Sequence, residues 1–220
     1  MGRYNAGVET RNHIIEVSKK LFYAQGFKNT KFAEICETAG VNSGTLAYHF
    51  QSKENLGKYI YTEMIAQEWK EILRIFPEED EITYMYLSIC VHQKLLFMDS
   101  GYRRFCSEMA GEFSAEFTQN SYRDLVPYTT QFVLKHLPGE EAEFYFHFIS
   151  GADCRIASYI NRYIGEITYE TMIRYTSKYY FSYLDEQDRE RGLERAMKLM
   201  KDVEISDIYF NISLAYRPAS

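Results

Sequence analysis

A run of short polar side chains between residues 42 and 49 is the part of this chain whose residue types best suit molecular recognition. The run reads NSGTLAYH and combines amide, hydroxyl, phenol and imidazole groups with two small residues. Serine and threonine hydroxyls can hydrogen-bond base edges, and a threonine methyl can meet the methyl group of thymine. Tyrosine, histidine and a helix N-terminus suit phosphate oxygens. The run therefore predicts contacts with double-stranded DNA, made by Asn42, Ser43, Gly44, Thr45, Tyr48 and His49.

A pair of short helices in the segment 30–56 is predicted to hold these side chains on one ridge. Phe32, Ile35 and Cys36 share the inward face of the first helix. Gly40 follows Cys36 where the chain must turn sharply, and glycine adopts a left-handed backbone at the least cost. The segment therefore predicts a helix-turn-helix, which places its second helix in the major groove. The apolar residues that bury this second helix are Val41, Leu46 and Phe50.

Two further residues flank the predicted reading surface. Thr30 precedes the first helix of the pair and Lys53 begins the helix that follows it, so both are predicted to clamp phosphates. Thr30 has an equally good alternative, in which it only caps the helix after it. Tyr48 and His49 could be ordinary surface residues, but their place beside a glycine-turned helix pair favours phosphate contact.

Residues about 10 to 57 resemble the DNA-binding domain of the TetR/AcrR family of bacterial transcriptional regulators. The resemblance is dense over about a fifth of the chain and rests on Ile14, Ile15, Leu21, Phe22, Gly26, Phe27, Ile35, Ala39, Gly40, Val41, Gly44, Thr45, Leu46, Tyr48, His49, Phe50, Ser52, Lys53, Glu54 and Leu56. It implies that Ser43, Thr45 and Tyr48 read or brace bases. It implies phosphate contacts by Thr30, Tyr48, His49 and Lys53.

The chain departs from the family pattern at three positions. Many members carry tyrosine where this chain has Ala47, and lysine or arginine where it has Ser43. Gln51 often has a basic counterpart. These differences predict fewer charged contacts with DNA and a shallower dependence of binding on salt.

Charge is distributed unevenly along the 220 residues. The net charge is -6, but residues 1–60 hold eight Lys and Arg against five Asp and Glu, which is a balance of +3. The remainder holds 17 against 26, a balance of −9. A basic head on an acidic body suits a protein that meets DNA at one end and keeps its other surfaces away from phosphates.

Composition places the chain among soluble globular proteins, with 46% hydrophobic and 25% charged residues. No apolar run approaches the roughly 18 residues of a membrane span, and no signal peptide is evident. A cytoplasmic location without a membrane partner is therefore expected. The four cysteines fit no metal or disulfide spacing and are expected to be buried free thiols: Cys36, Cys90, Cys106 and Cys154.

Helical patterning covers almost the whole chain. Helices are predicted over residues 10–25 and 53–76, and the tail 204–220 is left open because its alternating pattern also fits a strand. Pro127 is expected to kink or split its helix. Further helices are predicted at 81–99, 102–116, 119–137, 140–164, 168–184 and 186–203.

These helices predict an all-α fold in two parts. Residues 1–57 form a three-helix DNA-binding head that contains the helix-turn-helix. Residues 58–220 form a larger C-terminal body for effector binding and dimerisation, and the long helix 53–76 joins the two. The effector site and the dimer interface are implied by the family resemblance, since the body has no signature of its own.

The body is rich in aromatic residues, and the whole chain holds 20 Tyr and 15 Phe. Such residues belong to a core more often than to a ligand site, so the choice of pocket residues is open. For an apolar or amphipathic effector, the candidate pocket residues are Trp69, Tyr86, Phe105, Tyr122 and Phe148.

The family resemblance also implies a homodimer, which pairs helices 140–164 and 168–203 of each subunit into a four-helix bundle. Two heads roughly 34–36 Å apart would then meet successive major grooves of a palindromic operator. The hypothesis is a repressor whose effector tilts the helix 53–76 and so changes this separation.

Other functions fit the sequence less well. An enzyme is not expected, because no nucleophile elbow, phosphate-binding glycine loop or HExxH motif is present. Glu143 and His147 have metal-ligand spacing but no companion ligands, so neither a metal nor a cofactor is predicted. The remaining alternative is a DNA-bound adaptor protein that senses no small molecule.

Overall fold

The computed structural model describes residues 2–110, 112 and 127–218. Its helices are α1 (Gly2–Gln25), α2 (Phe32–Ala39), α3 (Ser43–Phe50), α4 (Lys53–Ile75), α5 (Glu81–Met98), α6 (Ser100–Met109), α8 (Pro127–His136), α9 (Gly139–Tyr163), α10 (Tyr169–Tyr180) and α11 (Glu186–Met200). Two strands follow them, β1 (Val203–Ile208) and β2 (Asn211–Tyr216).

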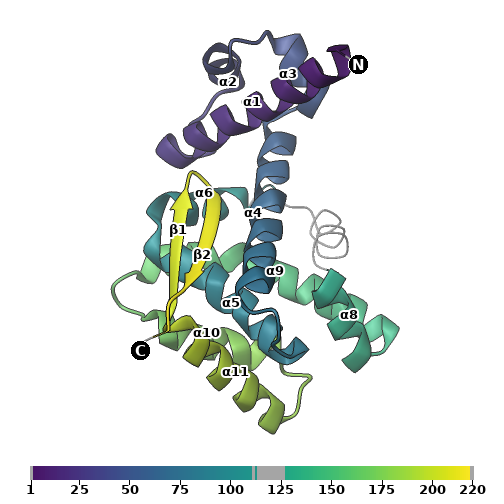
Figure 1. Ribbon diagram of the computed structural model, residues 1–220, viewed down its shortest axis with the longest axis vertical. Helices are drawn as coiled ribbons and strands as arrows, with labels where there is room; N and C mark the ends of the chain where they lie inside the picture. The colour runs from purple at the N-terminus through teal and green to yellow at the C-terminus, as the bar shows by residue number, and fades with distance from the viewer. Residues whose placement is uncertain (1, 111, 113–126, 219–220) are drawn as a thin grey trace.

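The helices form a small head and a larger body (Figure 1). The head consists of α1, α2 and α3 at one end of the molecule, and α4 runs from it along the body. The remaining helices build the body, and the β-hairpin lies against its side with its turn toward the head. The predicted helical fold with an N-terminal helix-turn-helix head is confirmed, and the hairpin is an addition to it. Among the described residues, no helix combines the length and the apolar character that crossing a membrane requires.

Most predicted helices agree with the structure to within a few residues. The first helix is longer than predicted, because α1 already begins at Gly2. α8 is described from Pro127 onward, and the expected kink or split at Pro127 involves residues that lie outside the described part of the chain. The predicted helices 102–116 and 119–137 extend partly into residues outside the described part of the chain.

The head is packed directly onto the body through α6. The ring of Phe22 on α1 stacks on that of Phe105 on α6 with a centroid distance of 5.7 Å. The Tyr23 hydroxyl donates a hydrogen bond of 2.7 Å to Asp99, the residue that caps α6. The backbone N–H of Lys28 donates to a Glu108 carboxylate oxygen at 2.9 Å. The head is therefore not connected to the body by α4 alone.

Gly57 lies where α4 contacts both the head and α6. A Cβ atom at this position would lie 2.8 Å from the Phe27 ring and 2.9 Å from the Met109 sulfur. Real Cβ contacts are longer than this, so only glycine allows α4 to approach the head and α6 so closely.

The C-terminal tail forms an antiparallel hairpin, which resolves the part of the sequence left open by its pattern. Strand pairing runs from Val203–Tyr216 to Ile208–Asn211 and leaves a two-residue turn. Its residues Tyr209 and Phe210 have φ angles of 53° and 66°. Such turns normally use Asn-Gly, because a left-handed backbone costs other residues roughly 1–2 kcal/mol each. Complete burial of the Phe210 side chain, worth about 1.5–3 kcal/mol, offsets this cost.

The hairpin is held along α4 by hydrogen bonds to its backbone. The Gln67 side chain donates to the carbonyl of Ile212 at 2.8 Å. The Leu214 N–H donates to Glu71 at 2.9 Å, and the Arg74 guanidinium donates to the Leu214 carbonyl. These contacts satisfy strand groups that a two-stranded sheet leaves unpaired, so the hairpin and α4 behave as one unit.

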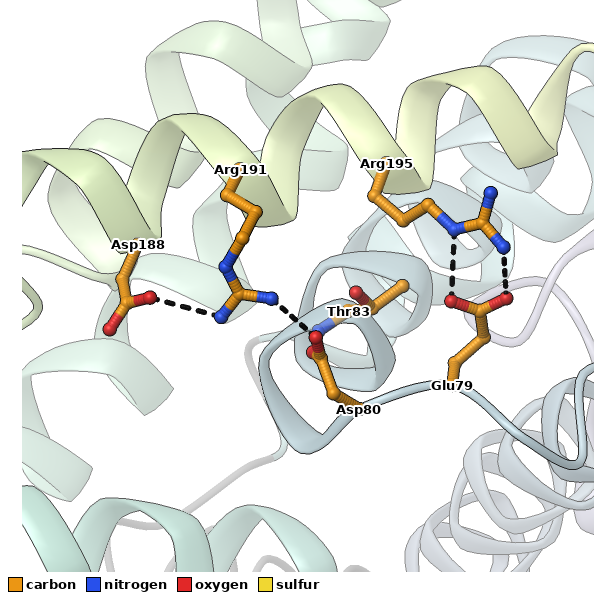
Figure 2. A network of polar contacts seen from close by, with 6 residues as sticks. All are labelled: Glu79, Asp80, Thr83, Asp188, Arg191 and Arg195. Atoms are coloured by element: carbon orange, nitrogen blue, oxygen red, sulfur yellow. Dashed lines mark hydrogen bonds and ion pairs between the residues drawn. The ribbon is translucent and has the colours of Figure 1, made fainter.

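A network of ion pairs ties α11 to the connection between α4 and α5 (Figure 2). Arg195 binds both carboxylate oxygens of Glu79, at 3.0 and 2.6 Å. Arg191 bridges Asp188 on its own helix, at 2.9 Å, and Asp80, which caps α5. The hydrogen bonds to these two carboxylates raise the pKa of Arg191. Exposed pairs contribute little singly, but the bidentate geometry fixes the place of α11.

Asp207 on β1 has a buried carboxylate that receives no hydrogen bond from a side chain among the described residues. Burial raises its pKa to about 7, and the negative charges of Asp99 and Glu68 act in the same direction. The Phe210 backbone N–H and the Lys19 ammonium oppose these effects only in part. Ionisation of Asp207 is therefore unfavourable in the folded protein.

Replacing this carboxylate should stabilise the protein in a pH-dependent way. An unfolded aspartate has a pKa of ~3.9. The folded protein therefore keeps a proton that the unfolded chain releases, and stability falls as pH rises from about 4 to about 7. Asp207→Asn should raise the melting temperature at about pH 8 and change it far less at about pH 5, where the carboxyl is protonated.

Thermal unfolding followed by circular dichroism measures this difference. Glu204→Gln on the same strand is the control, because Glu204 is exposed and should show no such pH dependence. An Asp207→Asn variant that melts with the same offset from the parent at both pH values would contradict the assignment.

Candidate nucleic-acid interface

The turn between α2 and α3 has the geometry that the sequence predicts. Gly40 adopts a left-handed conformation with φ 63° and ψ 32° and closes α2. The Val41 N–H then donates to the Cys36 carbonyl at 3.0 Å, which completes the helix end. Ile35 and Leu46 are fully buried between the two helices. The predicted helix-turn-helix is therefore present, and α3 presents its other side to solvent.

Asn42 orients the first turn of α3. Its side-chain oxygen accepts hydrogen bonds from the Thr45 N–H at 2.8 Å and from the Thr45 hydroxyl at 3.1 Å. The residue therefore caps the helix, a role that the sequence analysis did not give it. A Cβ on Gly44 would lie 3.2 Å from the same oxygen, so glycine leaves room for the cap. Ser43 and Gly44 are exposed beside Thr45.

Tyr48 and His49 form an aromatic pair at the far end of α3. The Tyr48 side chain is 84% exposed, the largest exposure among the large apolar residues described. Its ring meets the half-buried His49 ring edge to face at 5.1 Å. Because its ring is exposed and carries a hydroxyl that can hydrogen-bond, Tyr48 is placed where it can contact a duplex.

Thr30 does not have the capping role that the sequence suggested. The cap of α2 is Lys31, and Thr30 is only 1% exposed. The Thr30 hydroxyl donates to the Gly26 carbonyl at 2.7 Å and accepts from Gln25 at 3.3 Å. Contact with a phosphate would require this buried hydroxyl to leave the turn after α1, so the residue supports the fold of the head in this conformation.

Lys53 is also engaged inside the head. Its ammonium donates to the carbonyls of Phe27 and Thr30, each at 2.9 Å. The same group lies 4.3 Å from the centre of the Phe27 ring. Two of its three donors therefore fasten the start of α4 to the turn between α1 and α2. A phosphate could share this ammonium only through its remaining donor.

The connection from α3 to α4 is unusually tight. Gln51 has φ 63° and ψ −48°, and the Ser52 N–H donates to the Phe50 carbonyl at 2.7 Å. This is a γ-turn of the rare, strained form. Arg11 of α1 lies over the rings of Phe50, at 5.1 Å, and Tyr59, at 4.2 Å, and so holds both ends of the turn. The tight turn and the contacts of Arg11 together determine the angle between α3 and α4.

The predicted effector residues do not share one environment. Trp69 and Tyr86 lie in the body core, with exposures of 7% and 1%. Phe105 is buried at the joint between head and body rather than in a separate pocket. Phe148 is 55% exposed on α9, and Tyr122 lies outside the described residues.

A buried polar cluster in the body was missed by the sequence analysis. Glu68 of α4 is 2% exposed and accepts a hydrogen bond from the Tyr102 hydroxyl. The His92 Nδ1 atom lies 2.9 Å from that hydroxyl and 3.3 Å from the Glu68 carboxylate. Burial lowers the pKa of His92, but the Glu68 charge and hydrogen bond outweigh it, so the pKa is raised. The cluster joins α4, α5 and α6.

A second, partly buried pair extends the polar cluster. The Tyr180 hydroxyl of α10 donates to Asp153 of α9, and burial raises the pKa of this carboxyl to about 6. One signal in the sequence could have found Glu68. It stands on the buried stripe of α4 that contains Ile60, Met64 and Ile72 at four-residue spacing, where a carboxylate is out of place.

Comparison with known proteins finds relatives mainly over the head. Residues 14–60 match the family described as bacterial regulatory proteins, tetR family. The transcriptional regulator AcrR of Shigella flexneri is 42% identical over 53 residues, which are 24% of this chain and 25% of AcrR. TtgR of Pseudomonas putida is 34% identical over 74 residues, 34% of this chain and 35% of TtgR. The match thus spans between a quarter and about a third of these relatives.

Solved structures share the fold over most of the chain. RolR without ligand superposes with a TM-score of 0.62 at 14% identity, covering 84% of this chain and 96% of RolR. TylP of Streptomyces fradiae, a TetR regulator, gives a TM-score of 0.53 at 19% identity, covering 88% and 97%. At these identities the likeness concerns the architecture of head and body alone.

The Lys53 contacts predict a loss of stability when the ammonium is removed. Lys53→Met deletes two hydrogen bonds from a charged donor, and such bonds contribute about 1.5–3 kcal/mol each when partly buried. We expect a lower melting temperature, by about 2–4 °C per kcal/mol lost. Lys28→Met is the control, because Lys28 is exposed in the same turn. Equal melting temperatures for the two variants in thermal unfolding would refute the structural role of Lys53.

Proposed function

We propose that this chain, which belongs to the TetR family of bacterial regulatory proteins, is a homodimeric, sequence-specific DNA-binding repressor. A small apolar or amphipathic ligand would release it from a palindromic operator. The relatives named above are transcriptional regulators, and their similarity to this chain is concentrated in the head. Residues of the body support dimerisation and release.

The observation that carries the DNA-binding proposal is the outer side of α3. Ser43 and Tyr48 are exposed beyond a glycine turn and Thr45 is half-buried beside them, while Leu46 and Phe50 on the opposite side of the helix are buried. The Thr45 hydroxyl donates to the Asn42 side chain at 3.1 Å, so its lone pairs remain to accept a hydrogen bond at the start of the helix. The helix therefore offers hydroxyl groups that can hydrogen-bond base edges and an exposed phenol that can contact the DNA backbone.

An exposed stripe on α9 supports the dimer. Its large residues Phe144 and Phe148 are 71% and 55% exposed, and Tyr159 is 43% exposed. Exposed aromatic residues at helical spacing usually mark a protein interface. The positions of the stripe are Phe144, Phe148, Gly151, Arg155, Tyr159 and Arg162.

The neighbouring helices refine this interface. On α10, Tyr175 and Tyr179 are 55% and 60% exposed and stand four residues apart. By contrast, α11 packs its apolar side on α5 and exposes mainly charged residues, among them Glu186, Glu190 and Glu194. We therefore assign the two-fold interface to α9 and α10, and not to α11 as the sequence suggested.

Release by a ligand would act through α4, because this helix reaches from the head into the body. The contacts of Glu68 with Tyr102 and His92 hold its middle part. A ligand that binds beside Trp69 and displaces these contacts would favour a different tilt of α4. It must bind the tilted form more tightly, and a difference of ~1–3 kcal/mol is enough for regulation.

Substitutions on α3 should separate backbone contact from base contact. Tyr48→Ala should weaken binding to all duplexes, because a backbone contact carries no sequence information. Thr45→Ala should mainly reduce discrimination between operator variants, by about tenfold at the base pair it contacts. Thr38→Ala, an exposed threonine on α2, is the control.

Fluorescence anisotropy with duplexes selected from a random pool, at roughly physiological salt, measures both quantities. Binding by Tyr48→Ala as tight as that of the parent would remove the proposed backbone contact. A parent protein that selects no duplex would overturn the DNA-binding proposal itself.

The dimer interface can be tested without DNA. Phe144→Glu combined with Phe148→Glu places charges in the centre of the proposed contact, where burial of unpaired carboxylates is costly. We expect this variant to sediment as a monomer at micromolar concentration, while the parent sediments as a dimer. Ile208→Glu is the control, because Ile208 is 65% exposed and lies on the hairpin rather than on α9 or α10. A monomeric parent, or a dimeric double variant, would refute the assignment.

A further inference from the structure

We propose that the tip of the C-terminal hairpin, residues 209–211, positions the DNA-binding head on the body. The role rests on the proposed function, since the head positioned is the one that binds DNA. The hairpin belongs to the body through its hydrogen bonds with α4, yet its tip reaches α1 of the head (Figure 1). It therefore forms a further connection between the two parts, in addition to α4 and to the packing of α6 against α1.

On the head side, the tip contacts two residues of α1. The Tyr23 ring meets those of Tyr209 and Phe210 edge to face, each with a centroid distance of 5.4 Å. The Lys19 ammonium donates to the side-chain oxygen of Asn211 at 2.9 Å. Lys19 is only 8% exposed, which is unusual for a lysine and indicates that this hydrogen bond is held in place.

On the body side, the tip packs against α6. Phe210 is fully buried and lies 4.6 Å from Phe105 and 6.4 Å from Tyr102, measured between ring centroids. Tyr102 is the residue that hydrogen-bonds Glu68 of α4. A displacement of α4 or α6 in the body would therefore change the packing of the Phe210 ring, which also contacts α1.

The contacts with α1 and α6, and not the reversal of the chain, explain why tyrosine and phenylalanine occupy the turn. Both Tyr209 and Phe210 have positive φ angles, which Asn-Gly would adopt with less strain. Strained backbone persists where the surroundings fix it, and such positions gather at functional elements. The two aromatic side chains in this turn are therefore explained by a role as a wedge, that is, as rings packed between α1 and α6. A turn that only reverses the chain would not need them.

A wedge at this place would restrict rotation of the head about the end of α4. In the proposed dimer, such a rotation changes the separation of the two recognition helices, and so the operator spacing that they fit. The tip residues would therefore act as positioning residues. They would influence which half-site spacing is preferred without touching the DNA.

The decisive variant exchanges the wedge for a relaxed turn. Tyr209→Asn combined with Phe210→Gly should keep the hairpin, since this turn prefers that pair, but it removes the rings that contact α1 and α6. Hydrogen exchange without DNA should then become about tenfold faster for the α1 amides near Tyr23, and remain unchanged in α5. Phe210→Leu should give an intermediate rate. Ile208→Ala, an exposed neighbour outside the tip, should match the parent.

A second readout uses duplexes with two copies of the selected half-site, spaced one base pair more or less than the preferred distance. The parent should discriminate among these spacings, and the relaxed-turn variant should lose about tenfold of that discrimination. General destabilisation would instead lower binding to every spacing by the same factor. If the double variant does not fold, Lys19→Met removes the contact with the tip from the side of the head. Lys20→Met, at the exposed neighbouring position, is its control.

Unchanged exchange in α1, or an equal acceleration in α1 and α5, would overturn the positioning role. In the second case the hairpin would contribute only to overall stability. If the parent binds no duplex, the proposed function fails, while the exchange comparison still decides whether the tip holds the head.

Discussion

The close approach of α4 to the head at Gly57 is the constraint on which the rest of the structure depends. Because nothing larger than hydrogen fits between Phe27 and Met109, the helix passes the α1–α2 turn and α6 in direct contact. That contact lets Lys53 reach the carbonyls of the turn, and lets α6 stack on Phe22. Head and body therefore share one core, and α4 is embedded in it rather than serving as a free linker.

The helix-turn-helix could be predicted from the sequence because its signals are local. Gly40, the buried Leu46 and the polar residues after Asn42 all stand within one short segment, so spacing alone determines which side faces outward. The roles of Thr30 and Lys53 could not be read in this way. Their hydrogen bonds go to carbonyls whose position depends on how α1, α2 and α4 pack together.

The hairpin and the buried polar cluster could not be predicted from local sequence patterns. A Tyr-Phe turn carries none of the Asn or Gly signals of a hairpin, because its geometry is supported by Phe105 and Tyr23 from distant parts of the chain. Likewise, the partner of Glu68 on α6 is 34 positions away. Alternation in the tail fitted a strand without deciding its structure, and the pairing of the strands and their place beside α4 are tertiary properties.

The hydrogen bond between Lys19 and Asn211 joins positions 192 residues apart. Protein synthesis proceeds from the amino terminus, so α1 emerges long before the residues that cover its inner end. Contacts of such high sequence separation form late and slowly, because a long loop must close first. Helix α1 is thus synthesised well before its packing can be completed, and a newly made head stays incompletely packed until the residues of the hairpin have been synthesised.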